Sequence, residues 1–135
     1  RSQAILEGLA LLVALRVFAS RAGWGAAGHC APHLGVKSDS KAALGAAISL
    51  ASPSEPLNAI GREMAYDSAQ GEYYVAFFEH VPGVANKVPD WLSRVRRPPA
   101  AGSQGPRPVQ LDGAESLSVP VRDASWWRTR APPTR

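Results

Sequence analysis

The stretch "LGVKSDSKAALGAAISLA", residues 34–51, decides the fold class that the sequence predicts. Residues 34–38 are short and apolar enough for a β-strand, and residues 40–51 place apolar side chains at helical spacing. Asp39 stands between them, at the carboxyl end of the expected strand. A strand that leads directly into a helix is typical of α/β proteins, in which helices connect parallel strands.

Further elements of both kinds flank this stretch. A helix is expected over residues 3–20, and another from a cap at Ser54 to about Gln70. The segment "YYVAFFE", residues 73–79, is apolar on both faces and predicts a buried parallel strand, after which Asn86 is expected to cap a final helix. This order predicts an α/β fold with two short parallel strands packed by three to four helices. Two strands make a small sheet, so we expect a truncated domain whose other strands lie upstream.

The first expected helix is apolar on nearly every face, which predicts that it is buried on most sides. We expect a core helix and not a membrane span, because the apolar run over residues 9–19 is short and Arg16 interrupts it. The single cysteine, Cys30, excludes an internal disulfide and fits a reducing compartment. We therefore expect an intracellular protein, in the cytoplasm or nucleus, with no membrane partner. A secreted or membrane-anchored protein is the alternative.

Charge divides the chain into two regions. Acidic and basic residues balance over residues 1–95, so the net charge of +4 lies in residues 96–135, which are also rich in Pro and Arg. This division predicts one folded domain over 1–95 and a disordered basic tail over 96–135. Within the tail, "RDASWWRTR" (residues 122–130) offers two tryptophans between arginines that could stack on nucleic acid. An exposed tail without that role is the other interpretation.

Three carboxylates stand where a parallel α/β fold gathers its ligands. Glu7 lies early in the first expected helix, Asp39 follows the first strand, and Asp90 begins the last helix. Ligands of parallel sheets bind at the carboxyl ends of the strands, and His80 lies on the loop leaving the second strand. Clustered carboxylates favour hard cations such as Mg²⁺. Each residue alone also has a structural explanation, as a cap, a helix-terminal charge or a solvated side chain.

Three segments together resemble a known family. They are "AILEGLALLVALRVFA" (residues 4–19), "VKSDSKAAL" (residues 36–44) and "FEHVPGVANKVPDWLSRV" (residues 78–95). In this order they resemble the later part of a ribonuclease H domain of the kind attached to retrotransposon reverse transcriptases. The third is the most specific, because His, Pro-Gly, Asn and then Asp followed by Leu-Ser-Arg is characteristic of the retroelement members.

The resemblance implies a metal-dependent nuclease. By it, Glu7, Asp39 and Asp90 are metal ligands for two Mg²⁺ ions, and His80 is a mobile general acid or base. The implied reaction is endonucleolytic hydrolysis of the RNA strand of an RNA·DNA hybrid, with recognition through backbone shape and 2′-hydroxyl groups. The implied partners are the hybrid and an upstream polymerase part of the same polyprotein.

One departure from the family limits the expected activity. The family begins with three strands, the first of which supplies a fourth catalytic carboxylate, and no residues here match them. Asp123, in "RDAS", imitates that motif at the wrong end of the chain, so we assign it no such role. We therefore expect this chain to be a weakly active or inactive fragment. The alternative is a non-catalytic remnant that binds nucleic acid or a partner through its basic tail.

Overall fold

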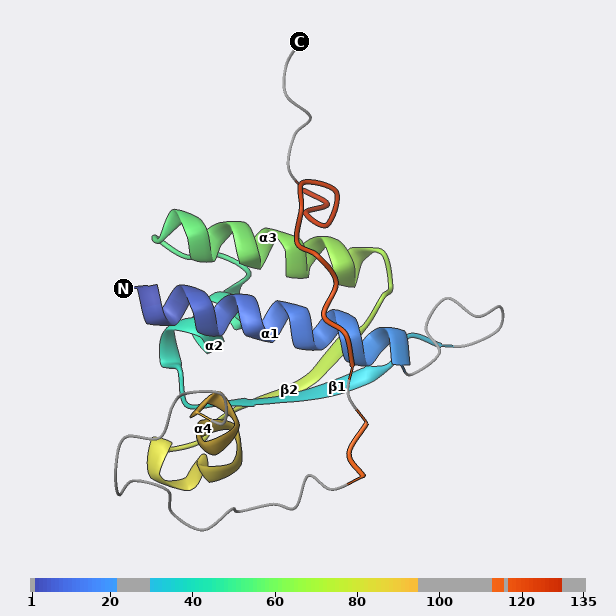
Figure 1. Cartoon of the computed structure of the whole chain (residues 1–135). Helices are drawn as coiled ribbons and strands as arrows, with labels where there is room; N and C mark the ends of the chain where they lie inside the picture. Colours follow the sequence, from blue (N-terminus) through green and yellow to red (C-terminus); the bar gives the residue numbers. More distant parts are fainter. Residues whose placement is uncertain (1, 22–29, 95–112, 116, 130–135) are drawn as a thin grey trace.

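The computed structural model describes residues 2–21, 30–94, 113–115 and 117–129. The elements follow in chain order: α1 (Ser2–Arg21), β1 (His33–Ser38), α2 (Lys41–Ser49), α3 (Glu55–Ala69), β2 (Tyr74–His80), the 3-10 turn η1 (Gly83–Ala85) and α4 (Lys87–Arg94). Within this part of the chain, β1 and β2 pair in parallel as a two-stranded sheet (Figure 1). The predicted α/β class, with two parallel strands and four helices, is confirmed.

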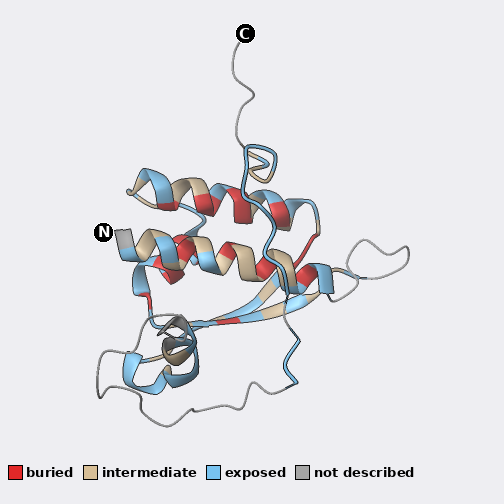
Figure 2. Cartoon of the chain, viewed as in Figure 1, coloured by how far each residue is buried: buried red, intermediate tan, exposed pale blue. Residues whose placement is uncertain are grey.

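Helices α1, α2 and α3 contact one another and lie on one side of the sheet (Figure 1). Their facing sides hold most of the buried residues (Figure 2). The larger core side chains are Leu12, Leu15, Val36, Leu44, Leu57, Ile60, Met64 and Tyr73. Burying this apolar surface is what fixes the three helices on the sheet.

The helix ends follow from local sequence. The Ser40 hydroxyl accepts a hydrogen bond from the Ala43 amide at 3.2 Å, so it caps α2, and Asp39 is left free of that role. Pro56 lies in the first turn of α3, where its missing N–H costs nothing. Gly71 has a φ of 69° just after α3, a conformation that glycine adopts without strain.

The outer face of β2 is more open than its composition suggests. Val75 and Phe78 pack against the core, whereas Tyr74 and Phe77 are 48% and 50% exposed. The expectation of a strand buried on both faces was therefore wrong. The physical reason is that the helices that pack on the sheet, α1 to α3, lie on one side of it only (Figure 1).

A register shift explains how β2 keeps two side chains on the helix-covered face. Leu34 pairs with Val75 and Gly35 pairs with Phe77, so Ala76 is an extra residue on β2. The ring of Phe77 lies directly over Gly35, where an added Cβ would come within 2.3 Å of it. A larger residue at this position of β1 would require the Phe77 ring to move.

The last part of the described chain is attached to the domain. Residues 126–129 run along α1 and α3 (Figure 1) and hydrogen-bond to both helices. The expectation of a disordered tail from residue 96 onward was therefore wrong for this segment, because its tryptophans and arginine find apolar and acidic partners on the domain. Residues 95–112, 116 and 130–135 lie outside the described part.

Helix α1 is longer than the apolar run within it. The window Gln3–Arg21 spans 19 residues with a mean hydropathy of 1.6, so length and composition alone would allow it to cross a membrane. The expectation that this helix is not a membrane span stays a prediction. In the structure α1 packs against α2 and α3, but only 22% of this window is buried, so the expectation of a helix buried on most sides was wrong.

Candidate functional site

The predicted metal ligands lie towards one end of the molecule. Both strands finish at the same end of the molecule (Figure 1). Helix α1 begins at this end, and α4 lies near it. Asp39 follows β1 and is exposed, with its Oδ2 3.8 Å from the position of a Cβ on Gly83, in the turn after β2. Glu7 is half-buried in α1 and accepts a hydrogen bond from Gln3 at 3.0 Å. His80 ends β2 and is exposed.

The described side chains of this set do not by themselves make a group of three metal ligands. Among the described residues, no three His, Cys, Asp or Glu side chains are grouped so that they could hold a metal ion. Asp90 lies in the first turn of α4, but its side chain falls outside the description. The metal site therefore stays a prediction, supported by topology and not by ligand geometry.

A different group of charged residues is brought together in the interior, and sequence reasoning missed it. Glu63 and Asp67, one turn apart on α3, are both 0% exposed. Arg16 of α1 reaches them with its Nη2 2.6 Å from Glu63 Oε2 and its Nε 2.7 Å from Asp67 Oδ2. The Tyr73 hydroxyl donates to Asp67 at 3.0 Å. We call Arg16, Glu63, Asp67 and Tyr73 the buried ionic cluster.

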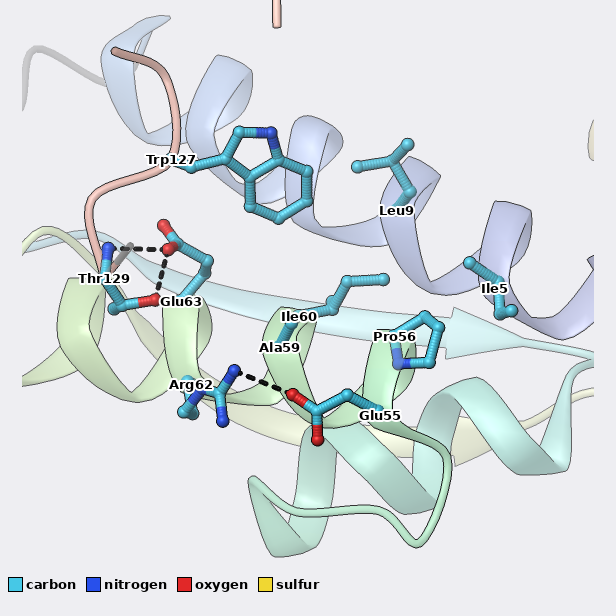
Figure 3. Close-up of a pocket in the computed structure, with 10 residues that line it drawn as sticks. All are labelled: Ile5, Leu9, Glu55, Pro56, Ala59, Ile60, Arg62, Glu63, Trp127 and Thr129. Carbon is cyan, nitrogen blue, oxygen red and sulfur yellow. Dashed lines mark hydrogen bonds and ion pairs between the residues drawn. The ribbon is translucent and has the colours of Figure 1, made fainter. Parts of the chain in front are cut away.

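The segment Trp126–Thr129, which we call the strap, completes this cluster from outside the α/β unit. The main-chain amide of Arg128 donates to one oxygen of Glu63 at 3.0 Å. The main-chain amide of Thr129 donates to the other at 2.7 Å, and its hydroxyl donates to the same carboxylate (Figure 3). The Arg128 guanidinium lies 3.1 Å from Asp67 Oδ1 and also pairs with Glu72. Within the described part of the chain, three of the four hydrogen bonds to Glu63 thus come from the strap, and the fourth comes from Arg16.

Both tryptophans of the strap are engaged. The Arg16 guanidinium lies 4.5 Å from the ring centroid of Trp126, a cation–π contact, and its Nη1 donates to the Trp126 carbonyl at 3.0 Å. Trp127 meets Trp126 edge to face, with ring centroids 5.0 Å apart. These contacts hold two half-buried rings on the domain, and nucleic-acid binding by the tail stays a prediction.

The electrostatics of the cluster favour its charged form. Burial alone would raise the pKa of Glu63, but the hydrogen bonds from Thr129, Arg128 and Arg16 outweigh it and lower that pKa below its ordinary value. Burial likewise opposes the charge on Arg16, yet Asp67 and Glu63 raise its pKa. Burial, together with the charge of Asp67, raises the pKa of Tyr73 well above the physiological range. At neutral pH Glu63 and Arg16 are therefore charged and Tyr73 is neutral.

One signal in the sequence could have located this cluster. Glu63 and Asp67 continue the helical spacing of Ile60 and Met64, so both acids fall on the apolar face of α3. Arg16 likewise interrupts an apolar helix. Charges on the apolar faces of two helices predict a buried ion pair between them.

The strap stands beside an open groove. A cavity of about 680 Å³ lies between α1 and α3 (Figure 3). Apolar side chains line it: Ile5, Leu9, Pro56, Ala59, Ile60 and Trp127. Glu63 and Thr129 close it at the strap, and the exposed pair Glu55–Arg62 lies on its rim. The chemistry suits an apolar side chain or ring, not a metal ion.

Comparison with protein-family models, with curated proteins and with solved structures found no match.

Proposed function

We propose that this chain is the later part of a ribonuclease H domain that accompanies a reverse transcriptase. The observation that carries the proposal is topological. Two adjacent parallel strands end where α1 begins and near α4, and an acidic residue stands on α1, after β1 and in the first turn of α4. The motif resemblance assigns the same three positions to metal ligands.

The chemistry proposed for this end of the sheet follows from its residue types. Asp39, Glu7 and Asp90 are oxygen donors, which Mg²⁺ prefers, and two such ions would activate a water and stabilise the leaving oxygen of a phosphodiester. The imidazole of His80, at the end of β2, could carry a proton during product release. The hydrolysed strand would be the RNA of an RNA·DNA hybrid, inside a cell.

Activity of this chain alone is expected to be weak or absent. The family uses a fourth carboxylate from an earlier strand, and the two-stranded sheet described here has free edges at which further strands could pair. The metal pair would then be complete only when those strands are present.

Metal binding is tested first, on the chain itself. Titration with Mn²⁺ should broaden the amide signals of residues near Asp39 and His80, and Asp39→Asn should remove that broadening. Asp123→Asn is the matched control, since Asp123 is a carboxylate without an assigned metal role, and it should leave the titration unchanged. Broadening that persists fully in Asp39→Asn contradicts the site assignment.

The reaction is tested on a longer protein in which this chain follows the family's first three strands. It should cleave the labelled RNA of an RNA·DNA hybrid in Mg²⁺, and Asp39→Asn or Asp90→Asn should each reduce cleavage by a factor of about 100 or more. Cleavage that survives both substitutions would rule out the proposed mechanism.

A further inference from the structure

We propose that the face formed by α1 and α3 is a binding site for a short Trp-Trp-Arg-Thr segment, and that the strap is its tethered ligand. The proposal concerns a surface away from the candidate metal site and does not depend on the nuclease assignment.

The receptor side of this site is acidic and incomplete without the strap. Glu63 and Asp67 are wholly buried, and Glu72 beside them is 8% exposed. Arg16 is the single basic side chain that the α/β unit contributes to hydrogen bonds with Glu63 or Asp67 among the described residues. Buried carboxylates with too few counter-charges are costly, so this face requires a cationic, hydrogen-bond-donating ligand.

The strap has the complementary chemistry at each position. Two successive main-chain N–H groups, of Arg128 and Thr129, grip the Glu63 carboxylate, which is how a peptide backbone binds an anion. The Arg128 side chain supplies the missing positive charge to Asp67. The Trp126 ring packs under Arg16, and Trp127 fills one end of the apolar groove. The site thus recognises the charge, the main-chain N–H groups and the aromatic rings of the strap together.

The segment also contains a local turn of its own. The Asp123 carboxylate accepts hydrogen bonds from the amide and the hydroxyl of Ser125 at 2.9 and 2.6 Å, and the Trp126 amide closes a turn on the Asp123 carbonyl at 3.2 Å. A local turn of this kind reduces the entropy lost on docking. The contacts therefore belong to a short linear motif, "DASWWRT", and not to an element of the sheet or helices.

The structure commits the site to the strap of the same chain. The Arg16–Trp126 and Arg128–Asp67 contacts join residues 110 and 61 positions apart within one molecule. A tethered ligand has an effective concentration of about millimolar, so it should outcompete the same segment supplied free.

A labelled peptide of residues 122–129 tests the proposal. It is titrated against the full chain and against the full chain carrying Trp126→Ala and Arg128→Gln, which weaken the tethered ligand without touching the receptor. Fluorescence anisotropy should show binding to the substituted chain at least about 100-fold tighter than to the intact chain. Equal binding to both chains would overturn the proposal.

The ligand can be varied independently of the receptor. A peptide carrying Arg128→Gln should bind the substituted chain at least about tenfold more weakly, because it loses the charge that Asp67 requires. A peptide carrying Arg122→Gln is the control, because the proposed binding uses no contact of the Arg122 side chain. It should bind with the same affinity as the unchanged peptide. If both peptides bind alike, the surface recognises general positive charge and the specific site is wrong.

A measurement on the intact chain covers the case in which the substituted chain does not fold. The Arg128 and Thr129 amides should exchange with solvent at least about tenfold faster than the Ile60 and Met64 amides of α3, because a docked ligand opens without global unfolding. Equal exchange rates would mean that the strap is an inseparable part of the fold. A concentration-dependent dimer of the intact chain, lost on Trp126→Ala with Arg128→Gln, would instead identify the strap of a second copy as the occupant.

Discussion

Glu63 and Glu55 stand on the same helix and face opposite environments. Glu63 is wholly buried and accepts hydrogen bonds from Arg16 and the strap, whereas Glu55 forms an exposed pair with Arg62 at 3.1 Å. The two carboxylates therefore separate the effect of a buried, multiply bonded charge from that of a surface ion pair.

Glu63→Gln should lower the free energy of unfolding by about 3 kcal/mol, because it removes the charge that balances Arg16 and weakens bonds from the strap. Urea unfolding measures this, with Glu55→Gln as the control, for which a change within about 0.5 kcal/mol is expected. A similar small change for both variants would show that the buried ionic cluster contributes little to stability.

The hydroxyl of Tyr73 provides a narrower test at the same place. Tyr73 is 1% exposed and its hydroxyl donates to Asp67 at 3.0 Å, so Tyr73→Phe should destabilise the fold by about 1–2 kcal/mol by leaving a buried acceptor short of a donor. Tyr66→Phe, at a side chain that is 41% exposed, should be near neutral. Thermal unfolding of the two variants compares them, and equal melting temperatures would contradict the prediction.

At the scale of elements, two glycines in neighbouring helices differ in how much space surrounds them. Gly61 of α3 lies against the chain after α2, where an added Cβ would come within 2.9 Å of the Leu50 carbonyl carbon, which is backbone and cannot swing away. Gly45 of α2 has nothing within 4 Å of the same position. The close approach of α3 to the end of α2 therefore depends on Gly61 and not on Gly45.

Gly45→Ala should stabilise the fold by about 0.5–1 kcal/mol, because alanine loses less backbone freedom in a helix. Gly61→Ala should destabilise it by about 1–3 kcal/mol, because α3 must move away from the preceding turn. Denaturant unfolding of the two variants measures both changes. Opposite signs are the expected result, and two stabilised variants would mean that the α2–α3 connection adapts freely.

The elements themselves were largely readable from sequence, because apolar spacing and caps act locally. The helix expected over residues 3–20 is α1, and the strand and helix on either side of Asp39 are β1 and α2. The exposed face of β2 and the extra residue Ala76 were not readable, because they depend on what packs on the sheet.

The candidate site divides in the same way. Parallel strands fix which ends lie together, so topology alone placed Asp39 and His80 towards one end. The buried ionic cluster escaped prediction because its partners, Arg16 and the strap, are joined only by the tertiary fold. Charge composition pointed to disorder in the tail, but a few specific contacts outweighed it between residues 126 and 129.

For the whole molecule, the pKa shift of Glu63 predicts a dependence of stability on acid pH. The folded pKa lies below the ordinary 4.5, so the unfolded chain binds more protons between these values. The stabilisation from Glu63 is therefore fully present above about pH 4.5 and is lost as the pH falls through the lower, folded pKa.

Urea unfolding at a series of pH values below 4.5 measures this loss, and the Trp126 and Trp127 indole signals should shift towards those of a free peptide over the same range. The Glu63→Gln variant should show a shallower dependence in this window, since it has no proton to bind there. An identical pH dependence in both proteins would assign the effect to other carboxylates.

The buried ionic cluster also gives the order of chain synthesis a consequence. Glu63 and Asp67 emerge from the ribosome with Arg16 already made, but Arg128 and Thr129 follow only after about sixty more residues, or several seconds of translation. Until then the nascent chain carries two carboxylates at the seam of α1 and α3 with an incomplete set of donors. The contacts between α1 and α3 therefore become complete only after the strap is made. A ribosome stalled before residue 126 would hold a domain whose helices are packed but whose buried carboxylates still lack the donors of the strap.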